Sequence, residues 1–287
     1  MAFCHNKKNV DLLNELSNAL SYAFMQRALF MAIIISCICA FFSCFIILKG
    51  WSLIGDAISH AVLPGITSAY LLKLPLALGA FLAGLFCMFL SSIIKSYSRV
   101  KEDAILGVIF SGMFALGLVM VSKIESDIHL MHILFGNLLG ISNQDVIECS
   151  LISLFALSWL YLQRKDFLLI CFDPAHASSL GFKTKTRQIL LLTLLTLCIV
   201  SALKAAGIIL VIAMLITPGA TAFLISKDFS SMFKIATSSA LISSISGCLL
   251  SYILNAATAP LIVCIQSIFF LLALFQNNKQ RLVPLNK

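Results

Sequence analysis

The stretch GDAISHAVLPG, residues 55–65, places an aspartate and a histidine four residues apart in an apolar segment. A spacing of four puts the Asp56 carboxylate and the His60 imidazole on one face of a helix. An ionised side chain near the bilayer centre costs roughly 2.5–3.5 kcal/mol on insertion scales, so intramembrane Asp and His are functional candidates. Carboxylate oxygen and imidazole nitrogen suit manganese, ferrous iron or zinc, and suit cuprous ion poorly. The pair therefore indicates a site for a divalent transition metal.

Three other residues of this stretch shape the helix around the pair. Gly55 and Gly65 let neighbouring helices approach closely or leave a narrow aqueous path. Pro64 has no N–H to donate to the His60 carbonyl, so a bend is expected there. Two ligands are too few for a metal site, and a buried Asp–His hydrogen bond that only locks helix packing is the alternative interpretation. A two-fold dimer would bring two such faces to a shared axis and supply four side chains.

The elements that must position this pair are membrane-spanning helices. Of the 287 residues, 60% are hydrophobic and 11% are charged, which excludes an ordinary soluble domain. We expect an all-α fold, a polytopic membrane helix bundle of about eight or nine transmembrane helices. The predicted spans are 28–48, 51–72, 76–95, 104–122, 146–162, 188–206, 207–226, 232–254 and 258–275. The apolar run 131–142 is too short to cross and predicts a re-entrant or interfacial piece.

The chain is expected to divide into three parts. Residues 1–27 carry leucines at helical spacing opposite polar residues, which predicts an amphipathic helix on the membrane surface or one packed on the bundle. Residues 28–278 form a single transmembrane domain, and residues 279–287 form a tail. The ten cysteines include no CxxC pair and are interpreted as small core hydrophobes.

The net charge of +8 sets the topology and does not indicate nucleic-acid binding, because the basic residues lie in short loops. If the loop 163–187 is cytoplasmic, fourteen of the twenty Lys and Arg residues fall on the cytoplasmic side and six fall outside. That is the direction of the positive-inside rule, and it predicts a cytoplasmic C-terminus.

Two further stretches contain residues that start, end or interrupt a helix. In FDPAHASSLGFKTKTR, residues 172–187, Asp173 and Pro174 begin a short exposed helix and Gly181 ends it. Pro218 removes the bond to the Met214 carbonyl within a later span, so a kink, a gate hinge or plain packing is expected there. No GxxxxGK[ST] stretch occurs, so this chain is not expected to hydrolyse ATP itself.

Five blocks of this sequence together resemble the permease subunits of bacterial ABC importers for manganese, zinc and iron, the ABC-3 permeases. They are LIGDAISHAVLPGI (53–66), KEDAILGVIFSG (101–112), HILFGNLLGIS (132–142), FDPAHASSLGF (172–182) and GIILVIAMLITPGATAFL (207–224). The resemblance implies that Asp56 and His60 bind the metal in the translocation path. It also implies that the loop 163–187 holds the coupling helix that fits a groove in the ATPase subunit. The coupling residues would be Asp173, Pro174, Ala175, Ala177 and Gly181.

The same resemblance implies a set of partners and a location. The partners would be ABC ATPase subunits, a metal-binding solute-binding protein, a second permease copy or a paralogue, and membrane lipid, with no nucleic acid. The chain would lie in the bacterial cytoplasmic (inner) membrane, with no tightly bound cofactor besides the transported metal. It would not be an enzyme, because the ATPase activity would reside on a partner chain. The alternative is a stand-alone ion-coupled divalent metal transporter, although such proteins often show internal repeats and none is convincing here.

Overall fold

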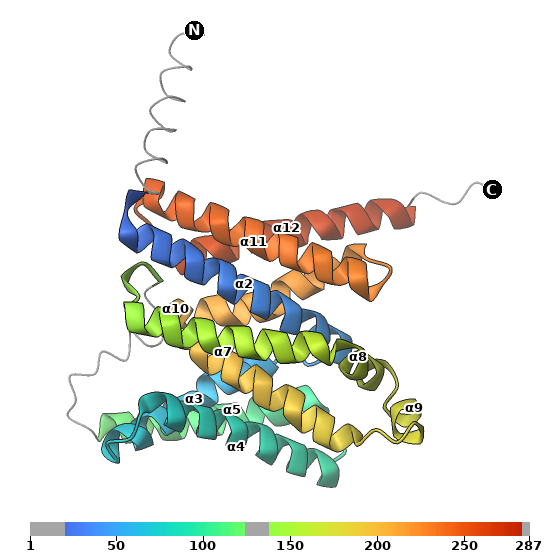
Figure 1. Ribbon diagram of the computed structural model, residues 1–287. Coiled ribbons are helices and arrows are strands. Elements are labelled where there is room, and N and C mark those ends of the chain that lie inside the picture. Colours follow the sequence, from blue (N-terminus) through green and yellow to red (C-terminus); the bar gives the residue numbers. More distant parts are fainter. Residues whose placement is uncertain (1–20, 124–137, 283–287) are drawn as a thin grey trace.

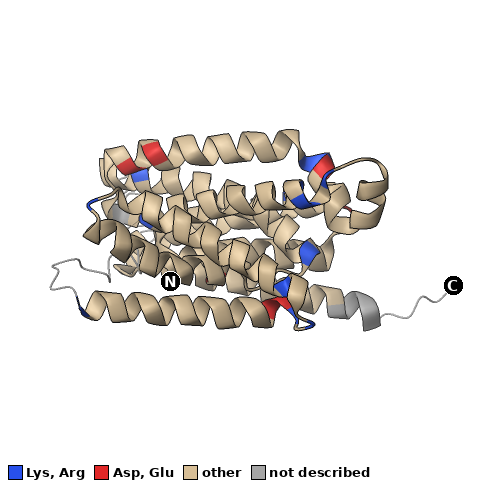
Figure 2. Ribbon diagram, turned by 90° about the horizontal axis from the view of Figure 1, so that it is seen from below, with Lys and Arg blue, Asp and Glu red and all other residues tan. Residues whose placement is uncertain are grey.

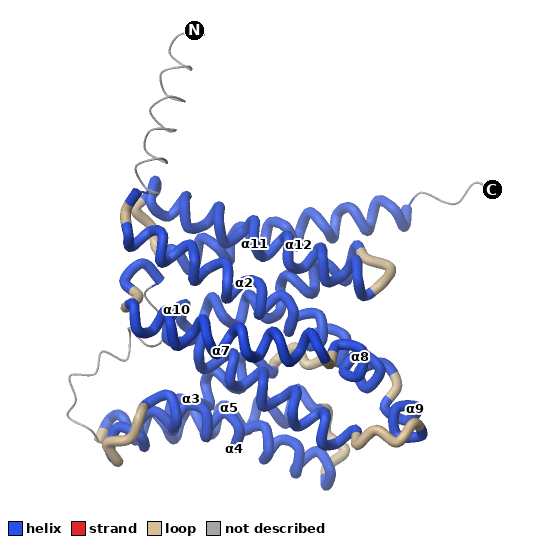
Figure 3. Tube along the Cα trace, viewed as in Figure 1, coloured by secondary structure: helices blue, strands red, loops and turns tan. Residues whose placement is uncertain are grey.

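The computed structural model describes residues 21–123 and 138–282, and the regular structure in these two parts is helical throughout, which confirms the all-α prediction (Figure 3). The longer helices pack into one bundle with short connections (Figure 1). In chain order they are α2 (Ala23–Lys49), α3 (Ile54–Leu71), α4 (Leu76–Tyr97), α5 (Glu102–Ser122), the 3-10 turn η1 (Leu138–Gly140), α7 (Asn143–Leu162), α8 (Arg164–Phe172), α9 (Pro174–Ser179), α10 (Thr184–Ile225), α11 (Phe229–Leu254) and α12 (Thr258–Leu282).

Seven helices in the described part of the chain are long and apolar enough to cross a membrane. They are α2, α4, α5, α7, α10, α11 and α12. α3 is more polar because it carries Asp56 and His60, but it packs along α4 and α5 within the same bundle.

α10 consists of two spans joined at Gly207, in agreement with the predicted spans 188–206 and 207–226. Gly207 has φ 76° and ψ 169°, outside the helical region. A straight helix of this length would extend about 63 Å, yet both ends of α10 lie beside α8. Arg187, near its start, pairs with Asp166 at 3.2 Å, and Phe229, just past its end, lines a small cavity with Arg164. The chain therefore turns back at Gly207, and the bundle contains nine spans in the described residues when α3 is included.

The charged residues gather at the two ends of the bundle, and its middle is nearly free of them (Figure 2). We call the end with α8 and α9 the α9 end, and the end where α10 turns back the Gly207 end. At the α9 end the Lys49 Nζ donates to the Ile170 carbonyl at 3.0 Å. At the Gly207 end Lys204 pairs with Glu148 at 3.0 Å and with Asp145 at 3.5 Å. This separation is what a bilayer imposes, because charges are least costly at its surfaces.

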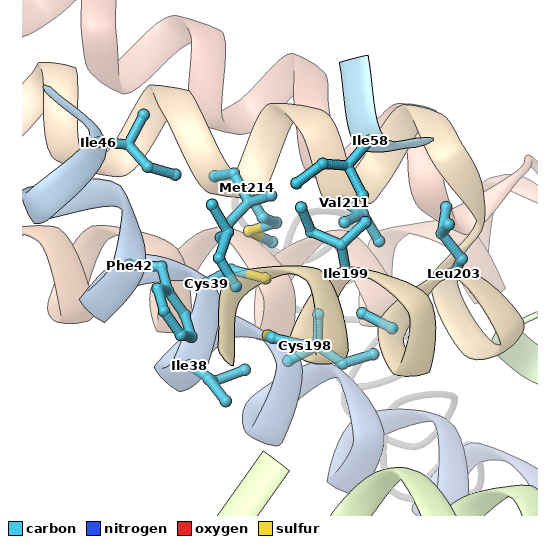
Figure 4. Close-up of a cluster of buried hydrophobic side chains, with 14 of the residues drawn as sticks. Ile38, Cys39, Phe42, Ile46, Ile58, Cys198, Ile199, Leu203, Val211 and Met214 are labelled. Atoms are coloured by element: carbon cyan, nitrogen blue, oxygen red, sulfur yellow. The ribbon is translucent and has the colours of Figure 1, made fainter. Parts of the chain in front are cut away.

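The core lies between α2 and the two halves of α10. Figure 4 shows Cys39 and Phe42 of α2 packed with Cys198, Ile199 and Met214 of α10. Both cysteines are fully buried, in agreement with their interpretation as small core hydrophobes. α3, which carries the candidate metal residues, is held against this core by α10 and is covered on other sides by α4 and α5.

Several predicted boundaries differ from the structure or lie outside it. α2 begins at Ala23, before the predicted position 28, and α12 continues into the predicted tail as far as Leu282. Residues 1–20 of the predicted surface helix lie outside the described residues, as does the run 131–142 up to residue 137. Its last part contains η1, a single 3-10 turn.

Candidate metal site

Asp56 and His60 lie on one face of α3, and their side chains point toward each other. His60 Nε2 is 3.2 Å from Asp56 Oδ1, and each side chain keeps roughly a quarter of its surface exposed, 26% for His60 and 29% for Asp56. Metal–nitrogen and metal–oxygen bonds are about 2.1 Å long, so both atoms could bind one cation at an angle of roughly 100°. The pair is therefore arranged as two neighbouring ligands of a single cation.

The rest of the imidazole is held by two aromatic rings of α5. Phe110 stacks on it, with ring centroids 5.7 Å apart and an interplanar angle of 22°. Phe114 meets it edge-on at 4.9 Å and 72°. His60 Nδ1 is buried, with no hydrogen-bond partner in the described structure. The rings fix the orientation of the imidazole, and Nε2 remains directed at Asp56.

The described residues of one chain do not complete a metal site. They contain no group of three or more His, Cys, Asp or Glu side chains that could hold a metal ion. Asp56 and His60 supply two ligands, and a divalent transition metal usually takes at least four. Any further His, Cys, Asp or Glu ligand must come from undescribed residues or from another chain.

The glycines around the pair serve close helix packing in this structure. A Cβ on Gly65 would lie 2.5 Å from the Ala83 Cβ and even closer to the Gly79 carbonyl oxygen of α4. A Cβ on Gly55 would meet Leu215 of α10 at 3.2 Å. Of the two predicted alternatives, helix approach or an aqueous path, these distances favour helix approach.

Pro64 lies within a continuous helix. α3 runs unbroken from Ile54 to Leu71 through Pro64, and a Cβ on Gly117 of α5 would lie 2.9 Å from the Pro64 nitrogen. α5 therefore rests directly on the side of Pro64 that has no N–H to donate.

Beside Pro218, the backbone of α10 bonds to α2. Gly219 N–H donates to the Ser43 hydroxyl at 2.8 Å, and that hydroxyl donates to the Ile216 carbonyl at 3.2 Å. A Cβ on Gly219 would be 2.6 Å from the Ser43 carbonyl oxygen. Pro218 thus occupies a tight contact between helices, and the gate hinge stays a prediction.

A short helix, α9, lies where Asp173 and Pro174 predict one. The Asp173 carboxylate accepts the N–H of His176 at 2.9 Å as the N-cap, and Gly181 follows the helix with φ 84°. Asp173, Pro174, Ala175 and Gly181 are exposed, so they can meet a partner. Ala177 is fully buried within this chain, and its expected contact with an ATPase subunit stays a prediction.

The sequence interpretation did not identify Phe110 and Phe114 as neighbours of His60. Both rings come from the block 101–112 or just after it, and their spacing of four repeats the spacing of Asp56 and His60. α3 and α5 run in the same direction, since Ser52 meets Asp103 at their starts and Pro64 meets Gly117 farther along. The spacing of four was the available signal, because it places both rings on one face of α5.

Comparison with known proteins places most of the chain in one family. The family described as "ABC 3 transport family" matches residues 21–277. The "Chelated iron transport system membrane protein YfeD" of Yersinia pestis is 48% identical over 281 residues, covering 96% of this chain and 95% of the relative. The "Manganese transport system membrane protein MntB" of Synechocystis is 47% identical over 255 residues, covering 89% of this chain and 83% of the relative. A solved structure, "PsaBC from Streptococcus pneumoniae in complex with Fab", superposes with a TM-score of 0.85 at 36% identity, covering 96% of this chain and 100% of that chain.

Proposed function

The chain belongs to the ABC 3 transport family, and from this we propose that it is the membrane permease subunit of an ABC importer for a divalent transition metal. Relatives are named for iron and for manganese transport, and both ions accept carboxylate and imidazole ligands. The metal is the cargo, and ATP hydrolysis takes place on separate subunits. The observation that carries the proposal is the Asp56–His60 pair, with its two ligand atoms 3.2 Å apart inside a membrane bundle.

We infer that the α9 end faces the cytoplasm and meets the ATPase subunits. The predicted orientation places fourteen Lys and Arg residues on this side and six on the other. α9 is short, exposed and fixed by the Asp173 cap, which suits it to transmit a movement between subunits. The Gly207 end would then receive the metal from a solute-binding protein, and the C-terminus would be cytoplasmic.

The incomplete ligand set supports a second permease subunit. A copy of this chain, or a paralogue, related by a two-fold axis near α3 would add a second carboxylate and a second imidazole. Two such pairs give four side-chain ligands, enough for the four-coordinate geometry that divalent transition metals commonly take. A stand-alone ion-coupled transporter is the other candidate, but it gives the exposed helix α9 no role.

Metal uptake by liposomes that carry the complete transporter tests the role of the pair. Asp56→Asn and His60→Ala should each abolish uptake of radiolabelled manganese and iron while the protein still folds, since both changes relieve the cost of an ionisable group in the membrane. Thr67→Val is the matched control, because Thr67 lies on the same helix and its hydroxyl bonds only to the Leu63 carbonyl of α3. If the pair is only a structural hydrogen bond, the same substitutions should lower the stability of the bundle. Near-normal uptake by the double variant would exclude the metal-site assignment.

Cross-linking tests the ATPase contact separately. A cysteine at the exposed position Ala175 should react with a cysteine in the ATPase subunit, whereas one at the buried position Ala177 should not. If neither position, nor any other exposed position of α9, reaches the ATPase, α9 is not the coupling helix.

A further inference from the structure

A cavity of about 400 Å³ opens at the Gly207 end between α3, α4, α7 and α10. Its mouth carries polar side chains, among them Ser142, Asp145 and Lys204. Its walls are apolar and include Leu63, Ile66, Ala80 and Val200. One buried water needs only about 10–15 Å³ of such space, so this cavity can hold many.

The cavity reaches the depth of the metal pair. Ser59, immediately before His60, lines its inner part. Ser59 lies twelve residues before Leu71, the last residue of α3, so the cavity extends roughly 18 Å from the Gly207 end along this helix. Ser59 is 2% exposed, and its hydroxyl has no hydrogen-bond partner in the described structure. An unpaired buried hydroxyl of this kind is costly, which makes Ser59 an unusual residue in a cavity wall.

The ring of Phe114 lies between the cavity and His60. Phe114 lines the cavity and meets the His60 ring edge-on at 4.9 Å. Phe110 also contacts His60 but does not line the cavity. The groove between α3 and α5 offers no parallel route, because Gly117 packs against Leu63 and Pro64 just beyond Phe114.

We propose that this cavity is the entry chamber through which the cation reaches Asp56 and His60 from the Gly207 end, and that Phe114 is the ring that closes it. The proposal rests on the proposed function and adds the route and the gate. A hydrophobic constriction blocks ions by excluding water. Rotation of the Phe114 side chain would connect the water of the chamber to His60 Nε2 without moving a helix.

The charges at the mouth favour the entry of a cation. Lys204 is neutralised by Asp145 and Glu148, at 3.5 Å and 3.0 Å, so it does not present a free positive charge to an arriving cation. The two carboxylates against one ammonium leave a net negative mouth, which favours cations over anions.

Thiol labelling from the outer side tests the chamber without using transport. In right-side-out membrane vesicles that contain the complete transporter, a membrane-impermeant, positively charged thiol reagent should label Ser59→Cys. Thr67→Cys is the control, because Thr67 is on the same helix and 5% exposed but does not line the cavity. Labelling is counted above the signal of the unsubstituted chain, which contains its own cysteines. If Ser59→Cys is labelled no faster than Thr67→Cys, the chamber is not open to the outer side and the proposal is wrong.

Two matched aromatic substitutions test the gate. In a His60→Cys background, Phe114→Ala should speed outer-side labelling of position 60 by more than about tenfold, because it removes the hydrophobic constriction. Phe110→Ala, which removes the other ring against His60, should leave the rate nearly unchanged. Phe114→Leu serves as a second variant, with an intermediate rate, if Phe114→Ala does not accumulate in the membrane. Equal acceleration by both alanine variants, or by neither, would overturn the assignment of Phe114. Loss of uptake in the Asp56 and His60 variants tests the metal site independently, so the two ideas can fail separately.

Discussion

Replacing Gly65 by alanine should force α3 and α4 apart. The new Cβ would lie 2.5 Å from the Ala83 Cβ and 2.8 Å from the Gly79 carbonyl carbon, whereas an ordinary contact needs about 3.4 Å. The side chain of alanine is only the Cβ methyl group, which cannot rotate away from the backbone of α4. The two helices must therefore separate by about 1 Å. Overpacking of this kind costs roughly 1–3 kcal/mol, and the upper part of that range applies because the obstacle is backbone. Metal uptake should fall as well, since α3 carries Asp56 and His60.

Gly112→Ala is the matched control for this prediction. A Cβ on Gly112 meets nothing within 4 Å, and this glycine also lies inside a membrane helix. It should be neutral or stabilising by about 0.5–1 kcal/mol, because glycine is a poor helix residue. Unfolding of the purified protein by SDS in mixed micelles measures both variants. If Gly65→Ala proves as stable as Gly112→Ala, the close α3–α4 contact is not present in the folded protein.

Three further substitutions test other parts of the fold. Gly207→Ala should destabilise the protein by about 1–3 kcal/mol, because φ 76° with ψ 169° is essentially restricted to glycine; an unchanged SDS midpoint would contradict the turn. Ser43→Ala leaves the Gly219 N–H and the Ile216 carbonyl without their partner and should cost about 1–3 kcal/mol in the same assay, with Ser238→Ala, on an exposed helix surface, as the neutral control. Asp173→Ala removes the cap of α9 and should weaken that helix by about 1 kcal/mol, while Asp173→Asn should largely preserve it. In an ATPase assay of the complete transporter, only the alanine variant should hydrolyse ATP without metal uptake. Equal coupling in both variants would show that the cap is dispensable.

Much of the fold follows from local features of the sequence. Apolar runs of about 20 residues must be helices in a bilayer, because each backbone polar group needs a partner within the segment. The spans predicted at 188–206 and 207–226 follow from the length of the apolar run, which Lys204 divides. They meet at Gly207, where α10 turns back and where glycine tolerates the backbone conformation. The start of α9 was predictable for the same local reason, because an aspartate followed by a proline is a strong helix start. The boundaries were less accurate, as at Ala23, because interfacial residues can extend a helix beyond the apolar run.

The residues that contact Asp56 and His60 from other helices could not be predicted from local features of the sequence. The sequence places Asp56 and His60 on one face of a helix but does not say which helix that face meets. The structure brings Phe110 and Phe114 of α5 against His60 and sets Gly65 against Gly79 of α4. It also buries Ala177, which the resemblance alone had suggested as a partner contact.

The sequence by itself therefore determined the helices, their approximate limits, the placement of Asp56 and His60 on one helix face and the family resemblance, because these depend on composition and on spacing along one element. Only the tertiary structure decided which residues meet between elements: the return of α10 to the α9 end, the cavity beside Ser59 and the shared ring of Phe114. The physical reason is that apolar helices in a membrane have many nearly equivalent faces. Close packing selects among them by shape, through small residues such as Gly65 and Gly79.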